Sequence, residues 1–366
     1  QTLKGHRDVI YSVAFSPNGK QAISGSRDGT SRIWNIADSE ELIKLIGFND
    51  GQNWIAVSPD GHFDGTPQGI QKMHYVQGLK IVLIEPFYKQ FYTQGLIALL
   101  LSQEKRELVL PLGHDNTAFS VAFSPDGKYV ISGGFDYSLI IWDVATGKEI
   151  RTIEGHSGWV NSVAFSPDGK YAISGSEDET LKIWDLASGT EIRTIKGHSD
   201  KVKSVAISPD GKYAISGSED KTIKIWDVAT GKEIRTLKGH RNHVKSVAFN
   251  SDGKYAISGS KDNIMIIWEV ATGKGIRSLV GHSDCINSVT FSPDDKYAIS
   301  GSNDKTIKIW KIATGTEIRT LKGHNKGISS VAFSPDGKYA ISGSENVKIW
   351  EVATGTEIRT LEIYKN

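Results

Sequence analysis

A repeat of 42 residues organises most of this 366-residue chain. The dipeptide Gly-His recurs in steps of 42, with its histidine at His114, His156, His198, His240, His282 and His324. An Ile-Trp pair recurs at the same interval, and one further unit lies upstream with His6 and Trp34. A fixed period of this length predicts an architecture in which one small structural unit is stacked many times.

A single unit, residues 156–195, predicts four short antiparallel strands. The alternating segment Val160–Phe165 ends at the tight-turn sequence Ser-Pro-Asp-Gly. Three further short segments follow, each after a turn: Tyr171–Ser176, Thr180–Trp184 and Glu191–Ile195. Of these, Thr180–Trp184 is rich in β-branched and aromatic residues, which favour strands. Because such a small sheet cannot bury both faces alone, we predict an all-β closed β-propeller of four-stranded antiparallel blades.

The span from Gly-His to Trp-Asp resembles the repeat of the WD40 family. The Trp-Asp pair itself is present at Trp142-Asp143, Trp184-Asp185 and Trp226-Asp227. On this resemblance we expect residues 1–366 to form a single WD40 β-propeller. The resemblance also implies a structural hydrogen-bond network in each blade, which in one unit joins His156, Ser174, Asp178 and Trp184.

The number of blades depends on the long interval between His6 and His114, which is 108 residues. Residues 53–61 align without a gap on residues 161–169, and both 41–46 and 107–112 have the character of a fourth strand. We therefore predict a divergent blade at 48–112 and favour eight blades in total. The alternative is seven blades with a subdomain inserted at 48–105.

A helix is predicted near 86–104, inside the divergent segment. Pro86 can begin a helix, and apolar residues recur after it at helical spacing: Phe87, Tyr88, Phe91, Tyr92, Leu96, Leu99 and Leu100. This helix is either a small satellite core on the propeller or a docking element for another domain. Residues 54–92 also resemble a segment of bacterial WD40 proteins in which a propeller is joined to a caspase-like peptidase.

Composition and charge narrow the partners and the compartment. Lys and Arg outnumber Asp and Glu by 43 to 42, so the net charge of +1 gives no global case for binding nucleic acid. The single cysteine, Cys285, excludes a disulfide within the chain and fits a reducing compartment. The most apolar run, Leu96–Leu101, is far shorter than the roughly 20 residues that span a bilayer. We expect a cytoplasmic protein that binds neither nucleic acid nor membrane.

The histidines and the Ser, His and Asp sets predict neither a metal site nor catalysis. Each histidine lies in its own unit, so the imidazoles cannot converge on one ion. Each possible triad recurs in nearly every unit, whereas catalysis needs one special site. No GxxxxGK[ST] phosphate loop is present. We therefore predict a protein that is not an enzyme and that uses no metal and no cofactor.

Three places in the repeat differ most between units. The first is occupied by Val9, Thr117, Trp159, Lys201, His243, Cys285 and Gly327; the second by Tyr11, Phe119, Asn161, Lys203, Lys245, Asn287 and Ser329. The third precedes the turn aspartate and is occupied by Arg27, Phe135, Glu177, Glu219, Lys261 and Asn303. In a propeller all three would lie on one side, around the mouth of the central channel. We call this side the channel-mouth face.

Two groups of neighbouring residues on this face are the predicted partner-binding site. The aromatic arc comprises Tyr11, Phe119, Phe135, Tyr137 and Trp159, and the basic arc comprises Lys201, Lys203, His243 and Lys245. Other units place Lys, Glu or Asn where these aromatic residues stand, so folding does not require the rings. Aromatic anchors beside cations predict a protein or peptide partner that carries acidic groups.

The sequence leaves three hypotheses for function. The first is a non-catalytic protein–protein interaction scaffold that binds its partner on the channel-mouth face. The second is a sensory or regulatory propeller of a larger peptidase or signalling ATPase, since the chain begins at Gln1 without an initiator methionine. The third is a small-ligand binder or enzyme that uses the central channel.

Overall fold

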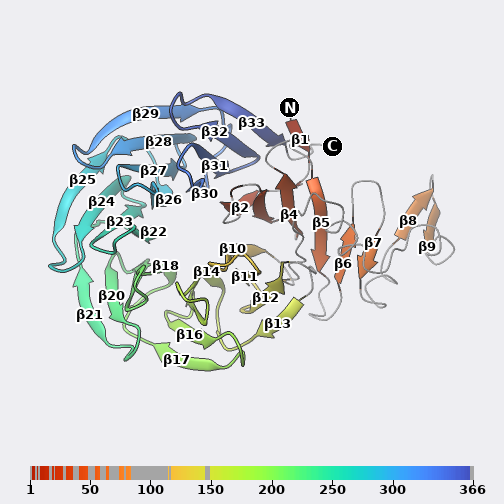
Figure 1. Ribbon diagram of the computed structural model, residues 1–366, viewed down its shortest axis with the longest axis horizontal. Coiled ribbons are helices and arrows are strands. Elements are labelled where there is room, and N and C mark those ends of the chain that lie inside the picture. The colour runs from red at the N-terminus through yellow and green to blue at the C-terminus, as the bar shows by residue number, and fades with distance from the viewer. Residues whose placement is uncertain are drawn as a thin grey trace.

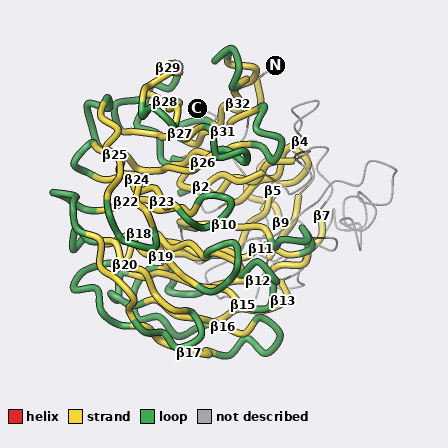
Figure 2. Tube along the Cα trace, turned by 60° about the vertical axis from the view of Figure 1, so that its left-hand side comes forward, coloured by secondary structure: helices red, strands yellow, loops and turns green. Residues whose placement is uncertain are grey.

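The structure is a computed structural model that describes part of the chain in detail. The described residues are 2–4, 6, 9–15, 19, 21–27, 30–35, 41–47, 54–57, 63–65, 74–77, 80–83, 114, 117–144 and 149–362. Within these residues the elements are strands joined by loops (Figure 2). The helix predicted near 86–104 lies outside the described residues.

Four classes of strand recur along the chain. The inner strands are β2 (Ile10–Phe15), β10 (Ala118–Phe123), β14 (Val160–Phe165), β18 (Val202–Ile207), β22 (Val244–Phe249), β26 (Ile286–Phe291) and β30 (Ser330–Phe333). The second strands are β3 (Gln21–Ser26), β11 (Tyr129–Gly134), β15 (Tyr171–Ser176), β19 (Tyr213–Ser218), β23 (Tyr255–Ser260), β27 (Tyr297–Ser302) and β31 (Tyr339–Gly343). The third strands are β4 (Thr30–Asn35), β12 (Leu139–Asp143), β16 (Leu181–Asp185), β20 (Ile223–Asp227), β24 (Ile264–Glu269), β28 (Thr306–Lys311) and β32 (Val347–Glu351). The outer strands are β5 (Glu41–Gly47), β13 (Glu149–Ile153), β17 (Glu191–Ile195), β21 (Glu233–Leu237), β25 (Gly275–Val280), β29 (Thr316–Lys322) and β33 (Glu357–Glu362).

The near-copy units between residues 117 and 362 form six consecutive blades, each an antiparallel meander of four strands from β10–β13 to β30–β33. The last of these sheets gains a fifth strand, because β1 (Thr2–Lys4) pairs in parallel with β33. The N-terminal segment thus adds to the outer edge of the C-terminal blade. Figure 1 shows the blades arranged in a ring with the inner strands around its centre.

The first unit lies in a six-stranded sheet, which occupies the place in the ring between β30 and β10. Its strands β2–β5 form the same meander as a blade. Two strands from the divergent segment, β6 (Trp54–Val57) and β7 (Phe63–Gly65), then extend the sheet outward from β5 (Figure 1). The remaining described strands of that segment, β8 (His74–Gln77) and β9 (Lys80–Leu83), pair only with each other among the described strands.

A serine on each inner strand bonds to the following blade and closes the ring. Its hydroxyl accepts a hydrogen bond from a valine backbone N–H at 3.0–3.3 Å, in the pairs Ser12–Val121, Ser120–Val163, Ser162–Val205, Ser204–Val247, Ser246–Val289, Ser288–Val331 and Ser330–Val13. The bond from Val121 to Ser12 joins β10 directly to β2. No blade therefore stands between the first unit and the unit that begins at His114.

The favoured prediction of eight four-stranded blades is wrong. It required residues 53–61 to supply the inner strand of a separate blade, but the strand there, β6, pairs with the outer strand β5. The alternative of seven four-stranded blades with a subdomain inserted at 48–105 is also corrected, because β6 and β7 belong to the same sheet as β2–β5. A short apolar segment can form the inner strand of a blade or an added strand at the outer edge of a sheet. Local sequence therefore does not decide between these two positions.

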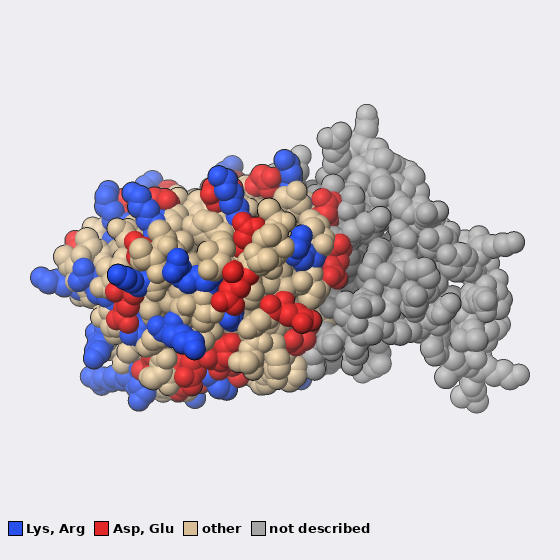
Figure 3. Space-filling model, turned by 90° about the horizontal axis from the view of Figure 1, so that it is seen from below, with Lys and Arg blue, Asp and Glu red and all other residues tan. Residues whose placement is uncertain are grey.

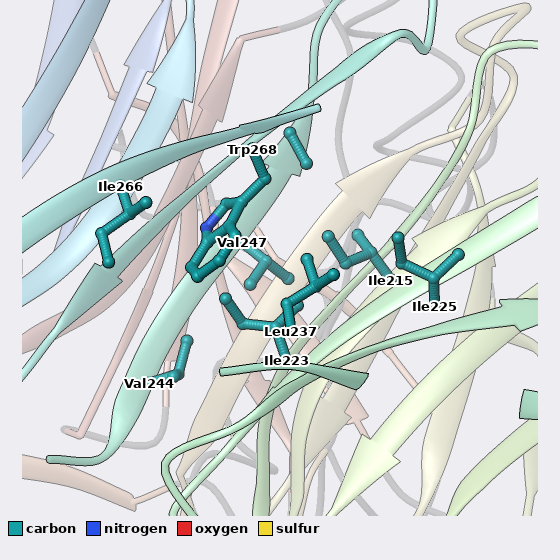
Figure 4. Close-up of a cluster of buried hydrophobic side chains, with 9 residues drawn as sticks. Ile215, Ile223, Ile225, Leu237, Val244, Val247, Ile266 and Trp268 are labelled. Carbon is teal, nitrogen blue, oxygen red and sulfur yellow. The ribbon is translucent and has the colours of Figure 1, made fainter. Parts of the chain in front are cut away.

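The hydrophobic core lies between neighbouring blades. In one such layer, Trp268 and Val247 of one blade pack against Ile223 and Leu237 of the blade before it (Figure 4). An equivalent layer joins the last blade to the first unit, because Ile10 and Trp34 share a cluster with Ile349. Each blade thus buries its faces only against its neighbours, which is why the repeats must close into a ring.

Candidate protein-binding face

The three variable places of each unit come together at one end of the blade. The backbone N–H of Glu177 donates to the carbonyl of Trp159, and that of Glu219 donates to the carbonyl of Lys201, both at 2.9 Å. These bonds fix the first and third variable places side by side. The same bond joins Phe135 to Thr117 at 2.9 Å.

The second variable place is a β-bulge on the inner strand. The pairing of the first two strands skips one residue there, which is Tyr11, Phe119, Asn161, Lys203, Lys245 or Asn287 in successive described units. A bulged residue leaves the ladder and its side chain is re-aimed. The channel-mouth face therefore carries side chains at positions where the sheet does not restrict their identity.

Four residues of the aromatic arc form a continuous stack that crosses neighbouring units. Tyr11 meets Phe119 edge to face, with ring centroids 5.5 Å apart, and Phe119 lies 5.7 Å from Trp159. Phe135 packs against the Trp159 ring, with ring centroids 4.6 Å apart. Such ring pairs are favourable beyond the area that they bury.

The stack remains accessible to solvent. Phe135 is 36% exposed, and Tyr11, Phe119 and Trp159 are half-buried. Tyr137, the fifth predicted residue, is 44% exposed but is not part of the stack, and its backbone has a positive φ of 68°. The equivalent residue Glu179 has the same φ, so this conformation belongs to the turn and not to the aromatic side chain.

The basic arc begins against the stack, where Lys201 and Lys203 share Glu177. The Lys201 Nζ lies 5.8 Å from the centre of the Trp159 ring, within cation–π range. It also donates to a Glu177 oxygen at 2.8 Å, and this hydrogen bond raises the pKa of Lys201. Lys203 donates to the other Glu177 oxygen at 3.2 Å.

The remaining cations of the arc share a second carboxylate, Glu219. Lys245 Nζ lies 3.4 Å and His243 Nδ1 3.6 Å from one oxygen of Glu219. Lys203 is within 4.0 Å of the same group. Burial lowers the pKa of Lys203, and repulsion by the Lys245 charge lowers it further.

The sequence reasoning placed the cations but missed their ion pairs. Glu177 and Glu219 were recognised only as variable residues, although each lies 26 positions before the lysine of the next blade that it contacts, Lys203 and Lys245. That repeated spacing is the signal that could have revealed the pairs. The arc is a mixed-charge cluster in which the glutamates neutralise part of the positive charge.

The four residues expected to form a structural network lie in one hydrogen-bonded chain. His156 Nδ1 is 2.8 Å from an Asp178 oxygen, and its Nε2 is 2.7 Å from the Ser174 hydroxyl. The Trp184 indole N–H donates to the same hydroxyl at 2.8 Å. Burial would raise the pKa of Asp178, but hydrogen bonds from His156 and Thr180 hold it well below its usual range. These groups are buried and occupied within the blade.

The last blade has a different version of this network. His324 Nε2 bonds to the Ser342 hydroxyl at 2.7 Å, and Trp350 donates to that hydroxyl at 2.9 Å. The turn aspartate is missing, and a Glu345 oxygen stands 3.7 Å from His324 Nδ1. Nδ1 is buried without a hydrogen-bond partner. The glutamate therefore supplies charge near the ring but not the hydrogen bond found in the other blades.

The described residues contain neither a cluster of metal ligands nor a membrane-spanning helix. In that part of the chain, no group of three His, Cys, Asp or Glu side chains is placed to hold a metal ion. Nor does any helix of the described segments have the length and apolar character needed to cross a membrane. Cys285 is buried, and burial raises the pKa of its thiol.

Comparison with known families finds repeats of the expected type. The family described as "WD domain, G-beta repeat" matches residues 1–35, 273–311 and 315–351. The family described as "Echinoderm microtubule-associated protein second beta-propeller" matches residues 118–284. The chain therefore contains WD40 repeats within a β-propeller.

Similar proteins come from fungi and from human. "Nuclear distribution protein PAC1" of Arthroderma otae is 32% identical over 162 residues, which are 42% of this chain and 30% of that protein. "F-box-like/WD repeat-containing protein TBL1Y" of Homo sapiens is 27% identical over 156 residues, 40% of this chain and 26% of that protein. The chain thus spans less than a third of either relative. Neither match supports the bacterial type or the caspase-like link predicted for 54–92.

Proposed function

We propose that the protein is a non-catalytic scaffold that binds a protein or peptide partner on the channel-mouth face. The observation that carries the proposal is the stack of Tyr11, Phe119, Trp159 and Phe135, which is accessible and crosses three neighbouring units. Other blades fold with Lys, Glu or Asn at these places, so the stack is not needed for the fold. Accessible aromatic residues of this kind are the usual anchors of protein interfaces.

The neighbouring charges favour a partner segment with acidic groups. Lys201, Lys203 and Lys245 form their ion pairs with two carboxylates, Glu177 and Glu219, so the lysines of these pairs outnumber the glutamates by one. A carboxylate of the partner beside its apolar anchor would balance that charge. This part of the proposal predicts binding that weakens as salt is added.

We propose that the protein is cytoplasmic and that its partner is neither nucleic acid nor membrane. Figure 3 shows Lys and Arg interspersed with Asp and Glu over the described surface on one side of the molecule. A mixed surface of this kind lacks the basic stripe that nucleic acid or anionic lipid would require. The single buried thiol of Cys285 fits a reducing compartment.

The test is a triple substitution, Phe119→Ala with Phe135→Ala and Trp159→Ala. Partners captured from native lysate by the unchanged protein would be identified, and the affinity of each purified partner would be measured for both proteins. We expect at least a tenfold loss of affinity, since anchor residues typically cost more than about 1.4 kcal/mol each. The control replaces three exposed aromatic residues, Tyr129, Tyr255 and Tyr339, which lie at the opposite end of the second strands. Unchanged affinity in the first triple variant would refute the assignment.

A second candidate is that the propeller is a sensory or regulatory module of a larger peptidase or signalling ATPase. The matched regions are small parts of long relatives, 30% and 26% of their lengths, and residues 54–92 resemble the bacterial segment described above. The coding sequence around this chain separates the two candidates. A peptidase or ATPase domain in the same reading frame supports the second, and its absence supports the free-standing scaffold.

A further inference from the structure

One position at the end of the outer strand distinguishes two units from the rest. It is the residue before the glycine of Gly-His or of its equivalent, and most units place a charge there: Glu154, Lys196, Lys238, Lys322 and, in the last unit, Glu362. Among the seven described outer strands the residue is aliphatic in the other two, as Ile46 on β5 and Val280 on β25. Register confirms the equivalence, because Ile46 pairs with Thr30 as Val280 pairs with Ile264. Charges at such places hinder the pairing of an exposed edge with another strand.

The outer edge that ends in Ile46 is already covered by an added strand. β6 pairs antiparallel with β5, and Ile46 stands opposite Ile55 in the register. The sequence of β6 is Trp-Ile-Ala-Val, which has no charge. The last blade shows the complementary case, because Glu362 stands opposite Lys4 in the parallel pairing of β33 with β1. At both covered edges the residue at this position stands opposite one of suitable chemistry: an aliphatic residue opposite an aliphatic one on β5 and β6, and opposite charges on β33 and β1.

The edge of β25 has the same aliphatic residue but no added strand. Within the described part of the chain, β25 is the last strand of its sheet. Val280 is 69% exposed and Ile276 is 49% exposed on the same face of the strand, whereas Leu279 on the other face is buried. Figure 1 places β25 on the outer rim of the ring.

The blade of β25 has also lost a polar network that other blades keep beside their outer strands. In the blade of β17, Lys182 Nζ binds a Glu191 oxygen and the Thr194 hydroxyl, both at 2.6 Å. The equivalent residues in the blade of β25 are Ile266, Gly275 and Ser278. Ile266 is buried near Trp268 (Figure 4). The blade of β25 therefore lacks the lysine and glutamate that form this ion pair in the blade of β17.

We propose that the outer edge of β25 binds the β25 strand of a second copy of this protein. Antiparallel pairing around a two-fold axis at Ser278 places Ile276 of each copy opposite Val280 of the other. This is the aliphatic match that Ile46 and Ile55 show within the chain, and it is self-complementary, as a two-fold interface requires. The one charge of the strand, on Arg277, lies on the opposite face, where its side chain packs against Gly315.

Sedimentation equilibrium of the purified protein from about 5 to about 500 µM tests the proposal. Two six-residue strands form a small interface, so we expect a dimer with a dissociation constant on the order of 100 µM. Val280→Lys restores the residue type of Lys196, Lys238 and Lys322, which three other units accommodate, and should raise the dissociation constant at least about tenfold. The matched control is Ile234→Lys on β21, whose edge keeps Lys238. It should leave the dimer unchanged, with circular dichroism reporting the fold of both variants.

A crosslink locates the contact independently of affinity. Ser278→Cys places two thiols opposite each other across the two-fold axis, and mild oxidation should yield a covalent dimer. Thr236→Cys, at the equivalent place on β21, should yield no more than the unchanged protein. A protein that remains monomeric throughout the concentration range overturns the proposal. So does a dimer that Val280→Lys does not weaken, or one that Ser278→Cys does not trap.

Discussion

The hydroxyl of Ser12 accepts a hydrogen bond from the backbone N–H of Val121 at 3.3 Å, across 109 residues of sequence. The equivalent bond on the other side of the same strand joins Val13 to Ser330 at 3.3 Å. The first unit is therefore held directly by the units on both sides. Of the segment between the two units, the described strands β6 and β7 extend the outer edge of the first sheet.

Deletion of residues 48–113 should therefore leave a closed propeller. The deletion joins Gly47 to His114 and recreates the Gly-His junction found at Gly155-His156. The bond between Ser12 and Val121 is retained, and among the contacts of the described residues the main loss is the pairing of β6 with β5. We expect a cooperative thermal transition within about 10 °C of the full chain, because edge pairing contributes little to the shared core. A deletion protein that elutes as an unfolded chain in size-exclusion chromatography would contradict a direct contact between β2 and β10 as the link that closes the ring.

Removing the turn carboxylate should destabilise a blade strongly. In Asp178→Ala the buried His156 ring loses the partner that lies 2.8 Å from its Nδ1. Leaving a buried donor unsatisfied costs about 1–3 kcal/mol, which would appear as a lower urea midpoint. The control, Glu154→Ala at an exposed position, should change the free energy of unfolding by less than about 0.5 kcal/mol. Equal effects of the two substitutions would show that the network contributes nothing particular.

Stability should fall as the solution is acidified. Burial opposes the effect, but hydrogen bonds hold the pKa values of Asp178, Asp220, Asp262 and Asp304 below their ordinary range in the folded protein. The unfolded chain then takes up protons first, so stability present above about pH 4 is lost progressively below it. Burial also lowers the pKa of His282, which adds a smaller loss as pH falls below about 6.5. Urea unfolding measured from pH 7 to pH 3 tests both parts, and constant stability across this range would exclude them.

A hydrogen-bonded cluster of Asn250, Ser251 and Asp295 joins two blades on the side opposite the channel-mouth face, and substitutions in it should have coupled effects on stability. Asp295, which replaces the usual turn glycine, accepts hydrogen bonds from the Ser251 N–H at 3.0 Å and from the Asn250 amide at 3.0 Å. Ser251 replaces the usual turn proline, which would have no N–H to donate. Asp295→Gly and Ser251→Pro should each destabilise the protein, but the double variant by less than their sum, with a coupling of about 0.5–3 kcal/mol. If the destabilisation of the double variant, measured by urea unfolding, equals the sum of the two single variants, the hydrogen bonds between Asp295 and Ser251 do not contribute as expected.

The sequence was sufficient for the strands of the near-copy units, because their alternation and turn residues repeat with a constant period. It was not sufficient for β6, whose alignment with Asn161–Gly169 indicated an inner strand. Whether that strand becomes an inner strand or extends an outer edge depends on hydrogen bonds between neighbouring blades, such as that of Val121 with Ser12. These bonds join residues that are remote in sequence. The same limit applies to the channel-mouth face. The residues of the basic arc were identifiable one by one, but their pairing with Glu177 and Glu219 depends on how adjacent blades are rotated against each other.

The unpaired extra residue on six of the seven described inner strands gives the ring a practical property. Since Tyr11, Phe119, Asn161, Lys203, Lys245 and Asn287 contribute no rung to the sheets, the strand pairing does not fix their side chains. The amides of Asn161 and Asn287 do donate to backbone carbonyls of the next blade, so these two also join neighbouring blades. A library randomised at these positions would vary ligand preference while the scaffold stays constant. Under the proposed binding role of this face, selectivity and foldability would be adjustable separately, both by natural divergence and by engineering.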